Sequence, residues 1–333
     1  MRACLIPAHG GIDALTIVER PVPRPAADEV LVRVHAGSLN YRDLAMVRRG
    51  LATPVVALSD GAGEIVDVGA GVTTWKPGDR VMSSFFRSWI SGPYRVSYGE
   101  GALGGGVDGM LAEYVCLPGD AVVEIPEYMS YEEASTLPCA GVTAYNALFG
   151  GSRVLMPGDT VLILGTGGVS IYGLQLAKAA GATVVATSGS DAKLERCRAL
   201  GATHTVNYRD EPEWWKGVRR ETGDGADHVL EVIGDLAGSI NAAAVGASIS
   251  IIGTTLAAAP VPPDIGGLIQ RKGVVIRGVF VGSTAMLRGL ARAMAANEIH
   301  PIVDAVYGFD DAKTAYEALA AAQHFGKIVI TLG

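Results

Sequence analysis

A short glycine-rich run is the part of the sequence whose spacing points most directly to chemistry. It follows an apolar stretch that begins at Thr160, and it consists of Gly165, Thr166, Gly167, Gly168 and Val169. Such a loop between a buried strand and a helix suits a pyrophosphate, because glycines let the backbone approach the phosphates and the helix N-terminus offers unpaired N–H groups. Ser170 stands where the motif usually has Gly or Ala and is small enough for close packing. An ordinary glycine turn in a βαβ unit is the alternative.

The residues after the next apolar run, 183–187, predict which dinucleotide would bind. An Asp or Glu there would hold the ribose 2′-hydroxyl of NAD, whereas this chain has Ser188. Ser188 and Ser190 can donate hydrogen bonds to a 2′-phosphate, and Lys193 can neutralise its charge. Asp191 comes too late to hold the ribose and suits the first turn of a helix. These residues favour NADPH. Ser190 as a helix N-cap beside a solvated Lys193 is the alternative.

The glycine loop and the turn after 183–187 must be positioned by the rest of the chain, in which apolar residues follow two different patterns. Short runs at 29–36, 61–69 and 112–117, separated by Pro and Gly turns, predict a compact β-rich barrel or sandwich. Later in the chain, continuous apolar runs alternate with helical patterns; they lie at 160–165, 183–187, 227–233 and 247–252. That alternation predicts βαβ units and a doubly wound parallel sheet covered on both faces, so the fold class is α/β.

Composition limits the classes of function. The chain has 333 residues, 49% hydrophobic and 18% charged, which is enough for two domains with large cores. Its net charge of -7 makes nucleic acid an unfavourable partner. The cysteines (Cys4, Cys116, Cys139 and Cys197) form no CxxC pair, which favours a reducing compartment. With no signal-like leader and no uninterrupted apolar run of about 18 residues, we expect a soluble cytoplasmic protein without a membrane span.

Six further segments belong together with the glycine loop. They are 37–43 (GSLNYRD), 61–66 (GAGEIV), 77–81 (PGDRV), 140–145 (AGVTAY), 206–209 (VNYR) and 324–329 (HFGKIV). Jointly they resemble the medium-chain dehydrogenase/reductase family, on its quinone-oxidoreductase-like side, from near Met1 to near Gly333. The resemblance implies a GroES-like β-rich catalytic domain over 1–130 and 281–333. It also implies a Rossmann domain over 131–280, with NADP(H) in the cleft between the two.

The resemblance also implies cofactor contacts at single positions. Thr143 would contact the nicotinamide side, Tyr208 would lie at the adenosine phosphate, and Lys327 would reach the cofactor from the C-terminal segment. Backbone contacts along the nicotinamide would come from Gly253, Thr254, Phe280 and Val281. The alternatives are a helix-start hydroxyl for Thr143, a loop aromatic packed on the Rossmann domain for Tyr208, and a solvated side chain for Lys327.

Zinc is not expected. Members of the family with zinc hold it with Cys, His and Cys plus a nearby Glu, and a catalytic zinc needs three such protein ligands. The matching positions here are Asn40, Ser59, Cys139 and, for the Glu, Asp60. The loop that would carry a structural zinc, 87–109, has no cysteine. We interpret Cys139 as a small buried hydrophobic residue near the cofactor.

Without a metal to polarise an alcohol or ketone, the resemblance favours hydride transfer from NADPH to a quinone or an α,β-unsaturated carbonyl. The charge that develops on the acceptor oxygen needs hydrogen-bond donors and then a proton. Asn40 would donate to a ribose hydroxyl or a substrate oxygen, Tyr41 would supply the proton, and Asp43 would orient them. A helix start with Asn40 as N-cap and Asp43 closing toward it is the alternative. An NADP-dependent alcohol dehydrogenase and a non-catalytic NADPH-binding protein remain open.

Two further expectations concern ligands. In the long irregular loop 87–109, Trp89, Tyr94 and Tyr98 would wall an apolar pocket for a small-molecule substrate, and Arg87 would bind an acidic substituent; a structural role for each is the alternative. The segment 273–281 resembles the Rossmann edge strand that pairs across a two-fold axis in this family. An exposed apolar edge strand needs a partner, so we expect a homodimer through Val274–Val281.

Overall fold

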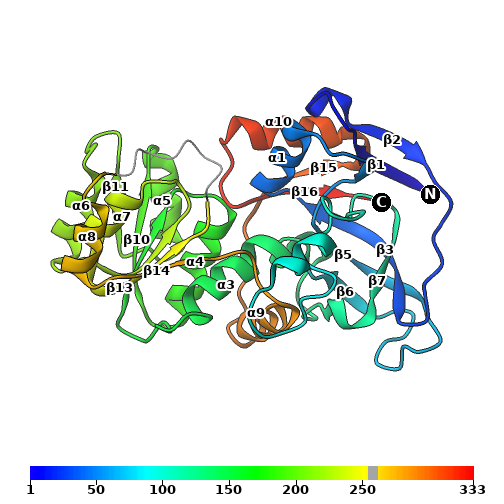
Figure 1. The fold of residues 1–333 in the computed structure, drawn as a ribbon, viewed down its shortest axis with the longest axis horizontal. Helices are drawn as coiled ribbons and strands as arrows, with labels where there is room; N and C mark the ends of the chain where they lie inside the picture. The colour runs from blue at the N-terminus through cyan, green and yellow to red at the C-terminus, as the bar shows by residue number, and fades with distance from the viewer. Residues whose placement is uncertain (254–261) are drawn as a thin grey trace. The chain divides into compact units, whose positions relative to one another are not determined.

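The structure is a computed structural model that describes residues 1–253 and 262–333; the expected cofactor contact Thr254 lies outside them. The chain divides into two compact units (Figure 1). The first unit comprises Met1–Val142 and Val281–Gly333, and the second is the continuous segment Thr143–Phe280. No helix in the described residues has both the length and the apolar character needed to cross a membrane.

A seven-stranded sheet forms the frame of the first unit. Its strands follow the order β15 (Val303–Gly308), β16 (Lys327–Thr331), β3 (Glu29–Ser38), β5 (Asp60–Val68), β6 (Arg80–Ser83) and β8 (Val122–Glu124), and β7 (Tyr114–Pro118) also pairs with β3. Only β15 and β16 run parallel within it. A smaller sheet joins β2 (Thr16–Glu19), β1 (Arg2–Ile6) and β4 (Val55–Val56). The predicted β-rich domain is confirmed.

β3 lies at the centre of this sheet, as its sequence pattern predicts. Val30, Val32 and Val34 are at most 1% exposed, whereas Arg33 between them is exposed. The last strand of the chain, β16, pairs antiparallel with the end of β3, with Ile330 opposite Gly37. This pairing brings Lys327, the first residue of β16, to the point where β3 gives way to the following helix.

The helices of the first unit are α1 (Tyr41–Arg49), α2 (Tyr131–Ala134), α9 (Thr284–Ala296) and α10 (Ala312–Ala321). Short helical turns lie at Ile12–Ala14, Val96–Gly101, Gly119–Ala121, Leu137–Gly141 and Phe309–Asp311. The first unit reaches Val142 instead of residue 130 because α2 packs on β3 and β5, and the turn Leu137–Gly141 packs on β5 and β6.

The second unit holds a six-stranded, fully parallel sheet. Its order is β11 (His204–Asn207), β10 (Thr183–Ser188), β9 (Thr160–Leu164), β12 (Ala226–Glu231), β13 (Ala243–Ile251) and β14 (Val275–Gly278). The helices are α3 (Val142–Phe149), α4 (Gly168–Ala179), α5 (Asp191–Ala199), α6 (Trp214–Thr222), α7 (Leu236–Ala242) and α8 (Ile265–Lys272). The predicted doubly wound sheet is confirmed, and the strand order reverses at β9, where such folds bind ligands.

Helix α4 packs very closely on this sheet. Ser170, at the third position of the glycine motif, is 1% exposed, and its hydroxyl donates to the carbonyl of Leu164, 2.8 Å away. One turn later, Gly173 leaves no space for a side chain: a Cβ there would lie 2.5 Å from Cδ2 of Leu230. Ser170 and Gly173 therefore allow α4 to lie close to the strands, and with it the turn that precedes the helix.

Replacing Gly173 by Ala should lower the midpoint of thermal unfolding. The added methyl group would overlap Leu230, and overpacking of about 1–3 kcal/mol outweighs the gain of up to about 1 kcal/mol for replacing a helical glycine. Gly266→Ala in α8 is the matched control, because a Cβ there meets nothing within 4 Å among residues 1–253 and 262–333 and should stabilise the helix. Equal shifts of both variants, measured by circular dichroism, would contradict this packing argument.

Candidate functional site

The start of α1 joins two of the three predicted catalytic residues, Asn40 and Asp43. Asn40 is the N-cap residue, and its backbone N–H donates to Oδ2 of Asp43 at 2.8 Å. The N–H of Asp43 donates in return to the carbonyl of Asn40 at 2.9 Å. The alternative interpretation of this segment, a capped helix start, is therefore correct, and it fixes the position of both side chains.

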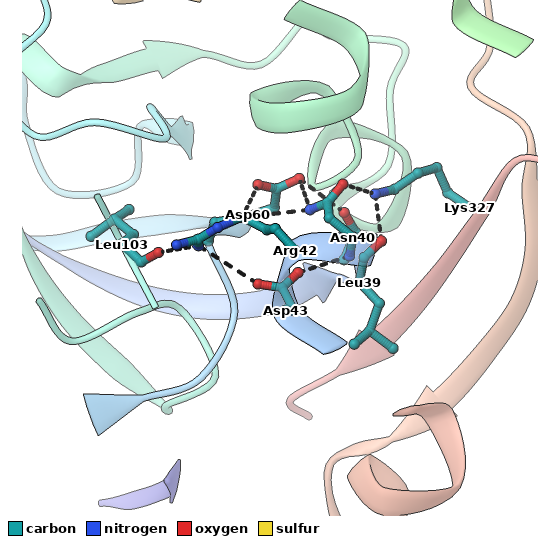
Figure 2. A network of polar contacts seen from close by, with 9 residues as sticks. Leu39, Asn40, Arg42, Asp43, Asp60, Leu103 and Lys327 are labelled. Atoms are coloured by element: carbon teal, nitrogen blue, oxygen red, sulfur yellow. Dashed lines mark hydrogen bonds and ion pairs between the residues drawn. The ribbon is translucent and has the colours of Figure 1, made fainter. Parts of the chain in front are cut away.

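The amide of Asn40 bridges three parts of the first unit (Figure 2). Its Nδ2 donates to Oδ2 of Asp60 at 2.8 Å and lies 3.5 Å from the hydroxyl of Ser59, while its Oδ1 accepts from Nζ of Lys327 at 2.6 Å. Both faces of the amide are thus engaged within the protein. The expectation that Asn40 donates to a ribose or substrate oxygen needs correction: the side chain holds Asp60 and Lys327 in place.

Lys327 is a buried cation and not a surface lysine. Its side chain is 3% exposed, and its ammonium donates to the carbonyl of Leu39 and to Oδ1 of Asn40, each at 2.6 Å. Burial lowers the pKa of Lys327, and the negative charge of Asp60 opposes that shift. The solvated-lysine alternative is wrong.

Two fully buried carboxyl groups accompany this cation. Asp60 is well supplied with donors, because the hydroxyls of Ser38 and Ser59 donate to it at 3.3 and 2.8 Å in addition to the amide of Asn40. Burial nevertheless raises the pKa of Asp60. Burial raises the pKa of Asp43 to about 6, and the charge of Asp60 contributes to the same shift. Within the described residues, Oδ1 of Asp43 accepts no hydrogen bond.

Arg42 and Leu58 lie next to the network of Asn40, Asp43, Asp60 and Lys327, and neither is among the site residues predicted from the sequence. The guanidinium of Arg42 donates to the carbonyl of Leu103 at 2.6 Å and lies over the ring of Phe85, 4.7 Å from its centre. Leu58, just before Ser59, has a φ of 67°, which is strained for a residue with a side chain. Arg42 thus connects α1 to the loop 87–109. No local pattern in the sequence predicts the contacts of Arg42 or the positive φ of Leu58.

Three other predicted residues of the first unit are not part of the hydrogen bonds that join Asn40, Asp60 and Lys327, although Cys139 is close enough for its thiol to feel the charges of Asp60 and Lys327. Tyr41 is the first residue of α1 and is 38% exposed. Cys139 is partly buried, and burial raises the pKa of its thiol well above the ordinary value. Val281 is buried and has a φ of 58°.

The aromatic residues of the loop 87–109 do gather. Trp89 is 3% exposed and stacks on Tyr98 with ring centres 6.0 Å apart, and Tyr94 meets Trp89 edge-on at 5.2 Å. Arg87 instead pairs with Glu29 at 2.5 Å. The expectation that Arg87 binds an acidic substituent needs correction, because its charge is matched by a carboxylate of the protein.

In the second unit the glycine loop has the geometry expected of a phosphate cradle. Gly165 has a φ of 72°, and Gly167 is the N-cap residue of α4. A Cβ at Gly165 or Gly167 would meet no atom of the described residues within 4 Å, so these residues leave the backbone at both positions open to a ligand. The N–H groups of the first turn of α4 point out of the helix start, as anion binding requires.

The turn after β10 presents hydroxyl groups and no acidic residue at its first positions. Ser188 is 5% exposed, and its hydroxyl accepts the N–H of Ser190 at 3.2 Å. Ser190 is the N-cap of α5 and accepts the N–H of Lys193, as the capping alternative predicts. Asp191 lies in the first turn of α5, as expected.

The remaining cofactor candidates lie at the following places in the second unit. Thr143 is the second residue of α3 and is 3% exposed. Tyr208 follows β11 and is 44% exposed, and Phe280 follows β14 and is 53% exposed. Gly253 lies so close to β12 that a Cβ would be 2.2 Å from the carbonyl oxygen of Val232.

Comparisons with known proteins agree with both units. Family models match residues 26–127, as an alcohol dehydrogenase GroES-like domain, and residues 168–296, as a zinc-binding dehydrogenase. A zinc-type alcohol dehydrogenase-like protein of Schizosaccharomyces pombe is 44% identical, over 97% of this chain and 96% of its own. The chain belongs to the medium-chain dehydrogenase/reductase family.

Solved structures of medium-chain dehydrogenase/reductase proteins superpose along the chain. A putative alcohol dehydrogenase from Sinorhizobium meliloti 1021 has a TM-score of 0.90 and 38% identity, covering 100% of both chains. A quinone oxidoreductase from Coxiella burnetii has a TM-score of 0.80 and 26% identity, covering 100% of this chain and 99% of its own. These neighbours support an oxidoreductase that binds a nicotinamide cofactor.

The side chains present do not fit the catalytic zinc that some members of this family hold. At the matching positions Asn40 offers an amide whose two faces are engaged, Ser59 offers a hydroxyl bonded to Asp60, and only Cys139 offers a thiol, which cannot form the site alone. Residues 1–253 and 262–333 contain no group of three His, Cys, Asp or Glu side chains placed to hold a metal ion. The ammonium of Lys327 would also repel a cation brought to Asn40.

Replacing Asp43 by Asn should change how stability depends on pH. The pKa of Asp43 is raised from 3.8 to about 6, so in this interval the folded protein keeps a proton that the unfolded chain releases. The stability that this carboxyl contributes is complete below its ordinary pKa and is lost as pH rises through the folded pKa. Between about pH 4 and pH 7, the free energy of unfolding of the wild type should fall by up to about 3 kcal/mol more than that of Asp43→Asn.

The measurement is the thermal midpoint of both proteins across this pH range. Asparagine can still accept the N–H of Asn40, so the helix start should persist in the variant. Asp13→Asn, at an exposed position, is the control and should follow the wild type. Parallel curves for the wild type and Asp43→Asn would contradict the raised pKa.

Proposed function

We propose that this oxidoreductase transfers hydride from NADPH to an electron-poor acceptor, a quinone or an α,β-unsaturated carbonyl, without zinc. The observation that carries the proposal is the buried network of Lys327, Asn40 and Asp60, which involves the positions that match zinc ligands in the resemblance. A metal-free site has no Lewis acid to stabilise the alkoxide of an alcohol. It suits an acceptor that is already polarised through conjugation.

The choice of NADPH rests on the turn after β10. Ser188 leaves room for negative charge where an NAD-specific fold has an acidic residue, and the open backbone at Gly165 and Gly167 fits a pyrophosphate. Ser190 and Lys193 lie at the start of α5, where the helix N-terminus favours an anion. In the proposal, Thr143, Tyr208, Gly253, Phe280 and Val281 provide further contacts to the cofactor.

In this mechanism NADPH, when bound, supplies the hydride. The chain must then stabilise the negative charge that develops on the acceptor oxygen and deliver a proton. We assign the proton to the exposed hydroxyl of Tyr41, which α1 positions next to Asn40. Asn40 and Asp43 act as positioning residues: they fix the start of α1, and Asn40 holds the ammonium of Lys327, whose positive charge favours an anionic oxygen. Trp89, Tyr94 and Tyr98 offer an apolar wall.

A second candidate is alcohol oxidation, because the Schizosaccharomyces pombe relative is named a zinc-type alcohol dehydrogenase-like protein. The test is NADPH and NADH binding by fluorescence titration, followed by turnover against quinones, enones, aldehydes and alcohols, with the zinc content of the same sample. We expect preferential NADPH binding, less than stoichiometric zinc, and turnover of quinones or enones that a chelator leaves unchanged. Stoichiometric zinc with alcohol-only turnover would refute the proposal, and binding without any turnover would indicate a non-catalytic protein.

We further propose that the protein is a homodimer joined along β14. This strand is at the edge of the parallel sheet of the second unit, and its first residue, Val275, is 45% exposed. An unpaired apolar edge favours pairing with a second copy. Val275→Lys should shift the wild-type dimer toward monomer in sedimentation experiments, because two-fold symmetry brings the added charges together. Val96→Lys, at a residue 87% exposed in the first unit, should remain dimeric. A monomeric wild type would refute the proposal.

A further inference from the structure

The turn that follows β11 lies directly against the turn that follows β10. The two strands are parallel neighbours, with Ser188 opposite Asn207 at their carboxyl ends. The N–H of Tyr208 donates to the carbonyl of Ser188 at 3.2 Å. The residues that follow β11 therefore lie beside Ser188, the position that usually selects between NAD and NADP, although they come about twenty positions later in the sequence.

Gly189 shows how close this contact is. A Cβ at Gly189 would lie 2.7 Å from the ring of Tyr208 and 2.9 Å from Nε of Arg209. Nε of Arg209 therefore lies beside the backbone of Gly189, between Ser188 and Ser190. Only a glycine between the two serines lets the arginine come so near, which gives Gly189 a specific role.

The surrounding charges leave this arginine available to a ligand. Arg209 is exposed, and in the described part of the chain it belongs to none of the ion pairs formed by its neighbours, such as Arg220 with Glu211. The nearby carboxylate of Asp191 accepts from Nδ2 of Asn207 at 2.8 Å. The Oδ1 of Asn207 in turn accepts the N–H of Arg209 at 3.0 Å. Asn207 thus holds Asp191 and fixes the backbone of Arg209.

We propose that Arg209 is the residue that binds the 2′-phosphate of NADPH, together with the hydroxyls of Ser188 and Ser190. This inference rests on the proposed use of NADPH and deepens it. A guanidinium presents several N–H donors in a planar fork that matches a phosphate, and it stays charged at any relevant pH. Lys193, half-buried in the first turn of α5, then adds charge without setting the geometry.

The test compares binding of NADPH with NADH, and of 2′,5′-ADP with ADP, by fluorescence and calorimetric titration. Arg209→Ala should weaken NADPH and 2′,5′-ADP by about tenfold to a hundredfold, the range for hydrogen bonds between charged groups, and leave NADH and ADP nearly unchanged. Arg209→Lys should recover part of the loss, since it restores charge without the fork. Arg220→Ala, which removes an exposed arginine that pairs with Glu211, should bind all four ligands as the wild type does.

Each failure has its own signature. If the wild type binds NADPH no better than NADH, the proposed use of NADPH is wrong. If the wild type prefers NADPH but Arg209→Ala weakens all four ligands equally, Arg209 contacts a part that they share, such as the adenine, and the inference is overturned. If Arg209→Ala changes nothing while Lys193→Ala removes the preference for NADPH, the lysine is the residue that binds the phosphate. Unchanged thermal midpoints for the variants exclude misfolding as the cause.

Discussion

The ammonium of Lys327 lies out of contact with water and needs compensating partners. An isolated buried charge costs several kcal/mol or more, and only close, well-oriented polar groups offset this cost. The carbonyl of Leu39 and the amide of Asn40 supply them, and Asn40 is in turn held by Asp60. The hydrogen bonds of the Lys327 ammonium thus fix where β16 lies relative to the end of β3 and the start of α1.

The same arrangement explains why a family built around one architecture can differ in chemistry. A divalent cation needs ligands that give up their protons or turn lone pairs toward it. In this chain a buried amine donates to the amide of Asn40, while Asp60 accepts from Ser38, Ser59 and Asn40. In the metal-free mechanism that we propose, the same fold would draw its local positive charge from the ammonium of Lys327.

Local signals in the sequence anticipated much of this structure. The glycine loop, the buried parallel strands and the capped start of α1 each depend on residues within a few positions; the sequence predicts the first two and offers the third as an alternative to a catalytic role. The site itself depends on pairs distant in sequence, such as Lys327 with Asn40, separated by 287 positions, and Arg87 with Glu29, separated by 58. Periodicity shows that a residue is buried but not which distant group will pair with it, so the partners of Asn40 and Arg87 within the protein could not be predicted from the sequence.

The pairing of β16 with β3 also has a consequence for the order in which the chain folds during synthesis. The second unit is one continuous segment, so it can fold as soon as Phe280 has left the ribosome. The first unit has to wait, because the end of β3, already paired with β5, gains its second neighbour only when β16 has been made, and the ammonium of Lys327 reaches Asn40 only with the same strand. A nascent chain that carries an assembled nucleotide-binding sheet thus still has an open strand edge in the first unit until β16 pairs with β3.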